Sequence, residues 1–237
     1  MTPTDAGDLM RRRHRRRTLA LLGAAGAGFF GWPAAARPAC IVTPAQTEGP
    51  FFLDTGLKRS DIRGEPGEST KLAGIPLALS LRVSAVSAGA CTPLTDALIE
   101  VWHCDAAGIY SGTSAAMGMR FLRGYQPTDS GGEARFLTVY PGWYPGRAIH
   151  IHFKVLAKSG NGRRVQFTSQ LYFDEAVNAE VMSQPPYAAR PDSRRVHNDR
   201  DYLYRDGGRL LTTTPAPAAG KGGTRGYAAA FAIGMRL

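Results

Sequence analysis

The sequence has no internal repeat, because its 28 glycines and 16 prolines follow no fixed period along the 237 residues. This absence excludes a collagen triple helix and an array of linkers, and neither a coiled-coil heptad nor a solenoid repeat is present. Charged residues are also few, at 20%, whereas 43% of residues are hydrophobic, so the chain can bury one sizeable core. This composition indicates a single, turn-rich domain built mainly from β-strands.

A hydrophobic run long enough to cross a membrane is absent too. The apolar and small-residue segment Thr18–Gly31 has 14 residues, which is too short to span a bilayer core of ~30 Å as a helix. Six arginines precede this segment and an alanine triplet ending at Ala36 follows it. This is the order of a secretory signal peptide, with cleavage expected after Ala36. Arg16 and Arg17, followed by a glycine-rich run, resemble a twin-arginine signal.

The leader also accounts for part of the positive charge. Of the formal net charge of +10, residues 1–36 carry +4, because six arginines stand against two aspartates. A basic arm that binds nucleic acid is the alternative, but it does not explain why an apolar run and an alanine triplet follow the arginines. We expect a leader at 1–36 and one exported domain, periplasmic or extracellular, at 37–237. No nucleic-acid partner and no membrane span are expected.

Cysteine is scarce, with three residues at positions 40, 91 and 104. An oxidising compartment would allow one disulfide and leave one thiol over. Cys91 lies near the tip of an expected hairpin and Cys104 at the far end of its second strand. They are separated by about seven residues at ~3.3 Å each, which disfavours a Cys91–Cys104 disulfide. The pairings Cys40–Cys91 and Cys40–Cys104 both stay open.

The rest of the chain has the pattern of β-strands. Leucines at 77, 79 and 81 alternate with small and polar residues, a period of two that is typical of a half-buried strand. Clusters of turn-forming residues separate the segments. Strands are expected at 77–85, 97–104, 135–139, 148–156, 164–173 and 227–235. This spacing predicts an all-β, antiparallel β-sandwich with long loops. A short helix is expected within 173–183 and a long basic loop region over 184–221.

The fourth expected strand carries two histidines on one face. Its isoleucines point into the core, so His150 and His152 point together to the opposite face, where they can share one metal ion. If Ser159–Asn161 forms a three-residue loop, His150 stands opposite Gln170 on the next strand, within ~5.5 Å. Gln170 would then lie at the rim of the same site. A register shifted by one residue would turn Gln170 to the other face.

Four motifs follow one another along the chain. Trp-x-x-Asp-Ala-x-Gly-x-Tyr ends at Tyr110, Gly-x-x-x-Thr-Asp-x-x-Gly covers 124–132, Pro-Gly-x-Tyr-Pro-x-Arg-x-x-His-Ile-His covers 141–152, and Gln-Leu-Tyr-Phe begins at Gln170. With Thr-Glu-Gly-Pro-Phe-Phe from Thr47, they resemble the intradiol ring-cleavage dioxygenases, the family of catechol 1,2-dioxygenase and protocatechuate 3,4-dioxygenase. Within that family the chain is most similar to the exported, signal-bearing branch.

The resemblance implies a mononuclear Fe(III) centre in the long loops of the sandwich. Carried over position by position, its ligands would be Tyr110, Tyr144, His150 and His152. Phenolate oxygens are hard, anionic donors that stabilise Fe(III) over Fe(II). The implied activity is the cleavage by O2 of a catechol or hydroxyquinol ring between its two hydroxyl-bearing carbons. The product would be a muconate-type diacid, as in aromatic-compound catabolism.

The resemblance also assigns roles to side chains around the iron. Tyr144 would leave the metal and take up a proton when the substrate binds. Arg147 matches the family's catalytic arginine, whose permanent charge would stabilise the electron-rich ring and a developing oxyanion. Gln170 would orient the substrate by hydrogen bonding. Phe51 and Phe52 belong either to the wall of the pocket or to the core.

Two other functions are compatible with parts of the sequence. A secreted β-sandwich could bind an aromatic, sugar or protein ligand without turnover, and it would be colourless where a ferric tyrosinate enzyme is red-brown. A zinc hydrolase could use His150 and His152, but the sequence offers no clear third ligand or general-base motif. Residues 194–225 carry a net charge of +4 and are expected to be solvated surface. The oligomeric state, including a homodimer, stays open.

Overall fold

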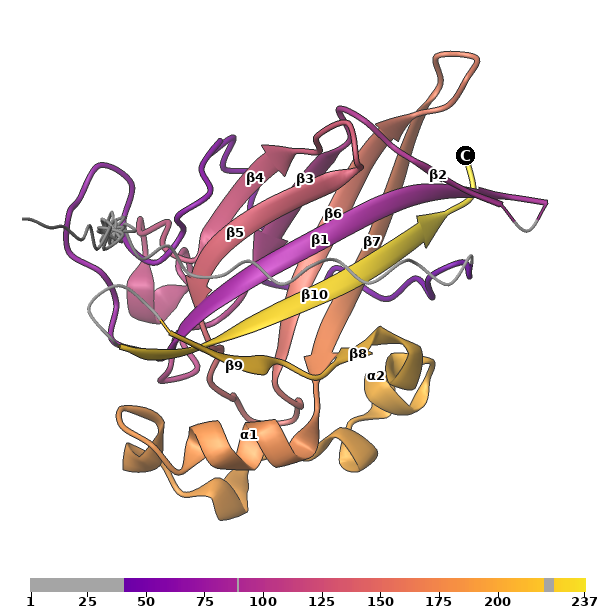
Figure 1. The fold of residues 1–237 in the computed structure, drawn as a ribbon. Coiled ribbons are helices and arrows are strands. Elements are labelled where there is room, and N and C mark those ends of the chain that lie inside the picture. Colours follow the sequence, from indigo (N-terminus) through magenta and orange to yellow (C-terminus); the bar gives the residue numbers. More distant parts are fainter. Residues whose placement is uncertain (1–40, 89, 220–223) are drawn as a thin grey trace, which may run out of the picture.

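A computed structural model describes residues 41–88, 90–219 and 224–237 (Figure 1). The expected leader and Cys40 lie outside these residues. All six expected strands are present, and the strand at 164–173 has the expected bounds. The strands are β1 (Pro76–Ser87), β2 (Ala90–Pro93), β3 (Leu98–Trp102), β4 (Arg123–Pro127), β5 (Glu133–Val139), β6 (His150–Lys158), β7 (Arg164–Phe173), β8 (Thr212–Thr213), β9 (Ala216–Ala219) and β10 (Arg225–Met235).

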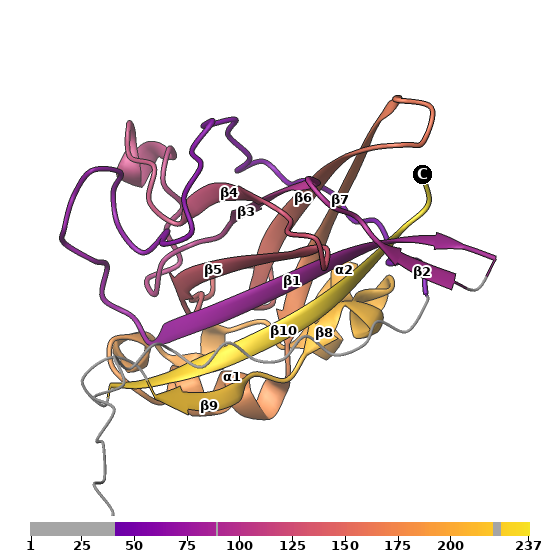
Figure 2. The same cartoon turned by 45° about the horizontal axis from the view of Figure 1, so that its top comes forward.

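The strands form two five-stranded sheets that pack against each other (Figures 1 and 2). One sheet has the order β2-β1-β10-β9, with β5 also paired to β1, and the other has the order β4-β3-β6-β7-β8. The predicted β-sandwich is therefore confirmed. Most strand pairs are antiparallel, but β1 pairs with β10 and β7 with β8 in parallel. These parallel pairs join segments that are distant in sequence, and local patterning does not reveal them.

The core lies between the sheets and follows the period of two. Leu77, Leu79 and Leu81 of β1 are fully buried, and they belong to the same cluster as Ile151 and Phe153 of β6. Because side chains alternate along a strand, this burial turns His150 and His152 to the outer face of their sheet. The hydrophobic pattern of β6 thus places the histidine pair, as the sequence predicted.

The hairpin between β6 and β7 differs from its expected register by two residues. His150 lies opposite Tyr172, and it is His152 that lies opposite Gln170. The prediction centred the loop on Gly160, whereas Ser159 N donates to Arg163 O, so that the loop is 160–162 and Gly162 takes the left-handed conformation at φ +80°. A shift of two residues keeps a side chain on its face. Gln170 therefore still shares the face of the histidines.

The segment after β7 contains more structure than a loop. The helix α1 (Glu175–Met182) is present as expected and is capped by Asp174, whose carboxylate accepts from Ala176 N at 2.9 Å. The expected loop region then contains β8, β9 and a series of short helices. These helices are η2 (Tyr187–Ala189), η3 (Asp192–Arg194), η4 (Asn198–Arg200), α2 (Tyr202–Arg205) and η5 (Gly208–Leu211), and η1 (Ser114–Ala116) lies earlier in the chain.

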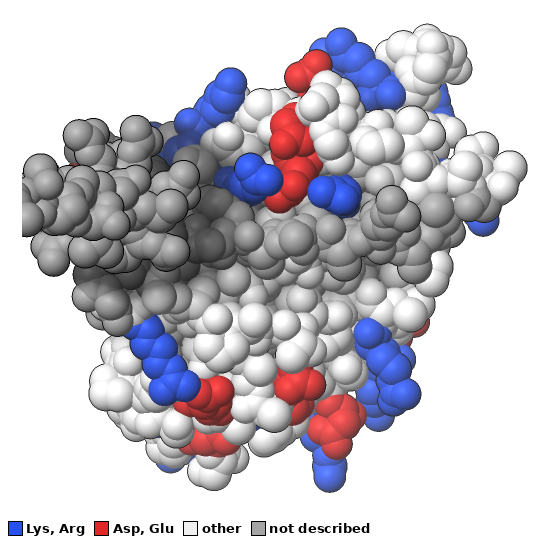
Figure 3. Space-filling view, in the orientation of Figure 1, with Lys and Arg blue, Asp and Glu red and all other residues white. Residues whose placement is uncertain are grey.

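This C-terminal region is not simply the solvated surface that its charge suggested. Arg195 is buried and pairs with Glu175 at 2.8 Å and with Asp192 at 2.7 Å. Asp201 is completely buried. On the face seen in Figure 3, basic side chains are interspersed with acidic ones. No helix among the described residues is long and apolar enough to cross a membrane.

Cys91 and Cys104 do not form a disulfide with each other, as the strand geometry predicted. Cys91 is disulfide-bonded, whereas Cys104 is a free, buried thiol. Cys104 lies just after β3, and its Sγ donates to Gly142 O at 3.4 Å. Burial raises the pKa of this thiol to about 12. Cys104 is therefore a packing residue in the protonated state at neutral pH.

Candidate metal centre

The four residues expected to bind iron come together at one end of the sandwich. Tyr110 lies in the loop after β3, Tyr144 lies in the loop between β5 and β6, and both histidines lie on β6. Tyr144 Oη lies 3.4 Å from His150 Nε2, which lies 3.0 Å from His152 Nε2. The ring of Tyr110 lies 5.6 Å from that of Tyr144 and 6.1 Å from that of His152, measured between centroids. Two phenols and two imidazoles thus converge.

The backbone determines which nitrogen His150 presents. Its Nδ1 lies 2.7 Å from Ala148 O, and since a carbonyl can only accept, Nδ1 carries the proton and Nε2 presents a lone pair to the cluster. Burial, together with the charge of Arg147, lowers the pKa of His150 to about 3. His150 is therefore neutral at physiological pH and has its free nitrogen directed at the other three residues.

His152 is held by packing. Its ring stacks on Trp102 with 5.0 Å between centroids and 5° between planes. Burial and the neighbouring His150 keep the pKa of His152 well below its ordinary value. Nδ1 of His152 is buried without a hydrogen-bond partner among the described residues.

The two tyrosines differ in their exposure to solvent. Tyr110 is 2% exposed, and within the described ranges its buried Oη has no hydrogen-bond partner. Burial raises the pKa of Tyr110 well above its ordinary value, and the nearby Cys104 and Tyr144 act in the same direction. Tyr144 is only partly buried, and burial raises its pKa to about 12 although the charge of Arg147 acts against this. Without a cation, both phenols are neutral at pH 7.

This donor set fits a ferric ion. An unpartnered phenol oxygen and imidazole nitrogens in close contact are groups that a metal would satisfy together. Within the described part of the chain, no group of three or more His, Cys, Asp or Glu side chains could hold a metal. The remaining donors beside the histidines are phenol oxygens, which favour Fe(III) as hard, anionic ligands. A zinc site of the usual hydrolase type would need a third such ligand.

Arg147 connects this cluster to the polar side chains beside it. Its Nη2 donates to Gln170 Oε1 at 2.5 Å and to Tyr172 Oη at 3.1 Å, and its Nε donates to Asp201 Oδ2 at 2.9 Å. Burial alone would lower the pKa of Arg147, but the carboxylate of Asp201 raises it above its ordinary value. A permanent positive charge therefore lies next to Tyr144 and His150.

Asp201 is the member of this network that sequence reasoning missed. Its Oδ2 also accepts from Ala148 N at 2.7 Å, and its Oδ1 accepts from Leu203 N and Tyr204 N at the start of α2. An aspartate before a helical turn is a recognisable cap. The cap predicts α2 but not the contact with Arg147, which lies 54 positions earlier.

An N-terminal segment, residues 46–52, lies across the cluster, and we call it the strap. Thr47 O accepts from Gln170 Nε2 at 3.0 Å. Phe51 stacks on Tyr110 with 4.4 Å between centroids, and Phe52 packs edge-on against Trp102 at 5.0 Å. Both phenylalanines therefore form the wall of the site rather than part of the central core.

Gly49 brings the strap close to a histidine. It has φ +72°, and a Cβ at this position would lie 3.2 Å from His152 Cε1. A glycine fits here because this conformation and this close approach both disfavour a side chain.

The other histidines lie outside the cluster. His103 is buried, with Nδ1 2.8 Å from Cys104 O and Nε2 2.7 Å from Thr138 Oγ1. Thr138 belongs to β5, so His103 joins the two sheets and has a structural role. His197 is half exposed and lies 3.2 Å from Glu175.

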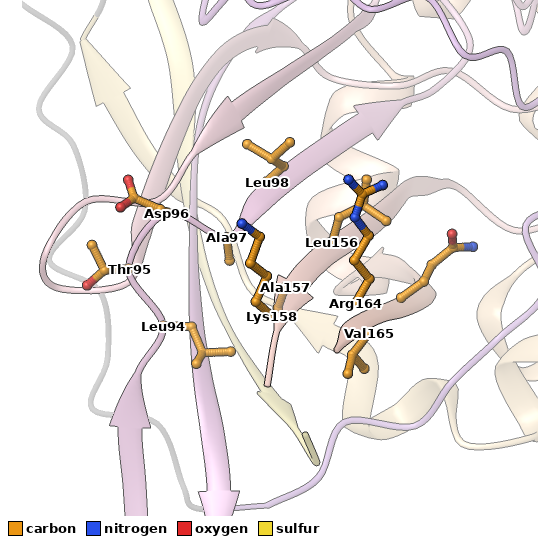
Figure 4. A pocket seen from close by; sticks show the side chains of 11 residues that line it. Leu94, Thr95, Asp96, Ala97, Leu98, Leu156, Ala157, Lys158, Arg164 and Val165 are labelled. Carbon is orange, nitrogen blue, oxygen red and sulfur yellow. The ribbon is translucent and has the colours of Figure 1, made fainter. Parts of the chain in front are cut away.

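A separate pocket lies at the other end of β6. Leu94, Leu98, Leu156, Lys158 and Arg164 are among its lining residues (Figure 4). Lys158 and His150 are the two terminal residues of β6, so the length of the strand separates this pocket from the cluster. None of the residues predicted to act in the site lines it.

The buried histidines predict a pH dependence for the metal-free protein. Burial lowers the pKa of His103 to about 4, that of His150 to about 3 and that of His152 well below 6.5. The unfolded chain therefore takes up protons first as the pH falls, so stability is full above pH 6.5 and decreases below it. Each of these histidines should lower the free energy of unfolding by about 1 kcal/mol between pH 7 and pH 5.5. Urea unfolding would measure this change.

Glu100 acts in the opposite direction and supplies a control. Burial raises its pKa to about 7, so the folded protein takes up this proton first and gains stability as the pH falls. The Glu100→Gln variant should therefore lose stability more steeply than the wild type over the same range. Equal slopes for the two proteins, or a wild type with a constant unfolding midpoint, would contradict this account.

Known proteins match the part of the chain that contains this site. A family model described as Dioxygenase matches residues 47–192. The chain is 37% identical over 93 residues to the protocatechuate 3,4-dioxygenase beta chain of Burkholderia cepacia, and 32% identical over 137 residues to hydroxyquinol 1,2-dioxygenase of Corynebacterium glutamicum. These matches cover 34% and 48% of this chain and 38% and 42% of the two relatives, less than half of each protein.

A solved structure extends the likeness over most of the fold. The intradiol ring-cleavage dioxygenase from Tetranychus urticae is 29% identical, with a TM-score of 0.68 over 83% of this chain and 95% of that one. The family model alone covers more than half of this chain, including the strap from Thr47 onward, both tyrosines, the histidine pair, Arg147 and Gln170. The chain therefore belongs to the intradiol ring-cleavage dioxygenase family.

Proposed function

We propose that this protein is an exported Fe(III) enzyme that cleaves a catechol or hydroxyquinol ring between its two hydroxyl-bearing carbons. The observation that carries the proposal is the convergence of two phenols and two imidazoles beside the buried charge of Arg147. Tyr110, Tyr144, His150 and His152 would hold the metal. A ferric ion bound there would supply Lewis acidity that favours the doubly deprotonated form of a catechol.

Tyr144 is suited to accept one of the substrate's protons. It is more exposed than Tyr110, which is buried and stacked under Phe51. Its phenol has a pKa raised to about 12. The phenolate form is therefore a strong base, and once it has taken up a proton the phenol stays protonated at neutral pH. Tyr110, which is more deeply buried, would stay in place. This asymmetry supports Tyr144 as the ligand that gives way to the substrate.

Arg147 and Gln170 would act on the substrate itself. Arg147 stays charged through its ion pair with Asp201, so it can stabilise the negative charge that develops as the ring is attacked by O2. Gln170 has its carbonyl oxygen bound by Arg147 and its amide nitrogen bound by Thr47 O. Its orientation is therefore determined before substrate arrives, which lowers the cost of aligning the substrate.

The overall reaction needs no further reductant. Both atoms of O2 enter the product, one C–C bond breaks, and the two hydroxyl-bearing carbons become two carboxyl groups. The four electrons that O2 accepts come from the substrate ring. We propose a catechol or hydroxyquinol class for the substrate because both offer the two adjacent hydroxyl groups that this chemistry requires. The short segment from Tyr144 to His150 supports an open site that also accepts bulky catechols.

The test of this function is colour together with oxygen uptake. The protein, loaded with ferric ion, should turn red-brown and consume O2 with at least one of catechol, protocatechuate, hydroxyquinol and alkylcatechols, forming a diacid in equal amount. A protein that stays colourless after ferric loading would instead support the binding-module alternative. Turnover confined to unsubstituted catechol would refute the open site but not the reaction. Secretion of the full-length chain would test export.

A further inference from the structure

Lys154 is a buried lysine that the proposed chemistry does not use. It lies on β6 two residues beyond His152, so its side chain is on the same outer face as the histidines. Lys154 is only 6% exposed. An ammonium group removed from water in this way needs compensating partners. Its partners therefore indicate what the lysine does.

The two side chains in direct contact with the Lys154 ammonium belong to the strap. Its Nζ lies 2.5 Å from Glu48 Oε2 and 3.2 Å from the centroid of the Phe52 ring. The first contact is an ion pair and the second a cation–π contact. On the neighbouring strand β3, its register partner is Glu100, and the charge of Lys154 acts to lower the pKa of that carboxyl group. One ammonium on the sheet therefore holds the strap at two points, on either side of Gly49 and Phe51.

Few backbone hydrogen bonds join this part of the chain to the sheets. Gln46 N, at the start of the strap, donates to Thr168 O, and Leu57 O, five residues after the strap, accepts from Tyr125 N. Between them, in the part of the chain that the structure describes, no backbone hydrogen bond joins residues 48–56 to either sheet. Side-chain contacts therefore determine where this stretch lies.

We propose that Lys154 is a positioning residue that fastens the strap over the metal ligands. Through Glu48 and Phe52 it keeps Phe51 against Tyr110 and Gly49 against His152. Phe51 also faces Tyr144 edge-on at 5.7 Å, on the side where the proposed function places the substrate. The consequence for substrate size rests on that function, whereas the fastening itself does not.

The test compares Lys154→Met with Lys158→Met. Methionine keeps the length and apolar stem of lysine but removes the charge, and Lys158 is an exposed lysine on the same strand and face. In metal-free protein, hydrogen exchange should be about tenfold faster in Lys154→Met at the Gln46 amide, which donates to Thr168 O, and at the Gly49 amide, which donates to Thr47 Oγ1. Lys158→Met should exchange like the wild type. Lys154→Arg should restore slow exchange, because it keeps the positive charge.

A second readout concerns catalysis. In the iron-loaded enzyme, Lys154→Met should raise KM for catechol about tenfold with kcat changed less than about threefold. It should also reduce the preference for catechol over alkylcatechols, because Phe51 is no longer held. Loss of a purely structural lysine would lower the amount of folded enzyme and leave the preference for catechol over alkylcatechols unchanged. An equal preference in Lys154→Met and Lys158→Met would overturn the proposal.

The outcomes separate this inference from the proposed function. A wild type that neither binds iron nor consumes O2 would refute the function, and the exchange experiment on metal-free protein would still decide the role of Lys154. Should Lys154→Met fail to fold, Glu48→Gln replaces it, because Glu48 is 36% exposed and its removal leaves no large cavity. Strap exchange in Glu48→Gln that matches the wild type would then overturn the fastening.

Discussion

Replacing Tyr110 with phenylalanine is expected to give a folded protein that binds ferric ion weakly, lacks the red-brown colour of the wild type and has lost at least about 100-fold in ring cleavage. The hydroxyl removed is buried and has no hydrogen-bond partner among the residues that the structure describes. Its loss should therefore cost the metal-free protein nothing, and relief of an unsatisfied polar group should raise stability slightly. Iron content, visible absorption and thermal unfolding with and without iron would measure these effects.

Tyr187 provides the matched control for this substitution. It is also buried, but its hydroxyl donates to Tyr140 O at 2.6 Å and accepts from Ile75 N at 3.1 Å. Tyr187→Phe should lower the free energy of unfolding by about 1–3 kcal/mol and leave the colour intact. The two variants should thus show opposite effects on colour and stability. Wild-type colour in Tyr110→Phe would remove Tyr110 from the proposed ligand set.

Replacing Asp201 with asparagine should damage both stability and catalysis. The carboxylate accepts four hydrogen bonds, from Arg147, Ala148, Leu203 and Tyr204. All four partners are donors, so the amide NH2 of asparagine must face two of them whichever way it is turned. The charge of Arg147 also loses its counter-charge while 9% exposed. We expect a loss of about 3 kcal/mol in the free energy of unfolding and about 100-fold in kcat, because Arg147 is displaced.

The pH dependence of this variant has a definite sign. Burial acts to raise the pKa of Asp201, but hydrogen bonds from Ala148 and the charge of Arg147 outweigh it and hold the pKa below the ordinary 3.8. The stability that the carboxylate contributes is therefore complete above pH 3.8 and is lost as the pH falls further. The difference between wild type and Asp201→Asn should be constant from pH 7 to pH 5 and shrink only in stronger acid.

Asp199→Asn is the control for charge alone. Asp199 lies two positions earlier with its side chain 77% exposed, and its contact with Arg200 is a surface ion pair. It should change stability by less than about 0.5 kcal/mol. If Asp199→Asn and Asp201→Asn proved alike in unfolding and in kcat, the positioning role of Asp201 would be refuted.

Local patterns were sufficient for the strands that carry the site and insufficient for their neighbours. The alternation of β6 predicted that His150 and His152 share a face, and β7 has its expected bounds. By contrast, β4 has the sequence Arg-Gly-Tyr-Gln-Pro, whose glycine and proline are typical of a turn. It becomes a strand because β3 offers a free edge for pairing. Short strands of this kind depend on their neighbours more than on propensity.

The sequence by itself determined the sandwich, the outward histidine pair and, through the order of its motifs, the family. Only the tertiary structure decided that Gln170 lies opposite His152, since turn geometry sets register and one hairpin sequence is compatible with more than one loop. Only the tertiary structure likewise brought Asp201 to Arg147 and Lys154 to the strap. Contacts between segments far apart in the chain depend on how the sheets and loops pack. A local hydrophobic pattern does not predict that packing.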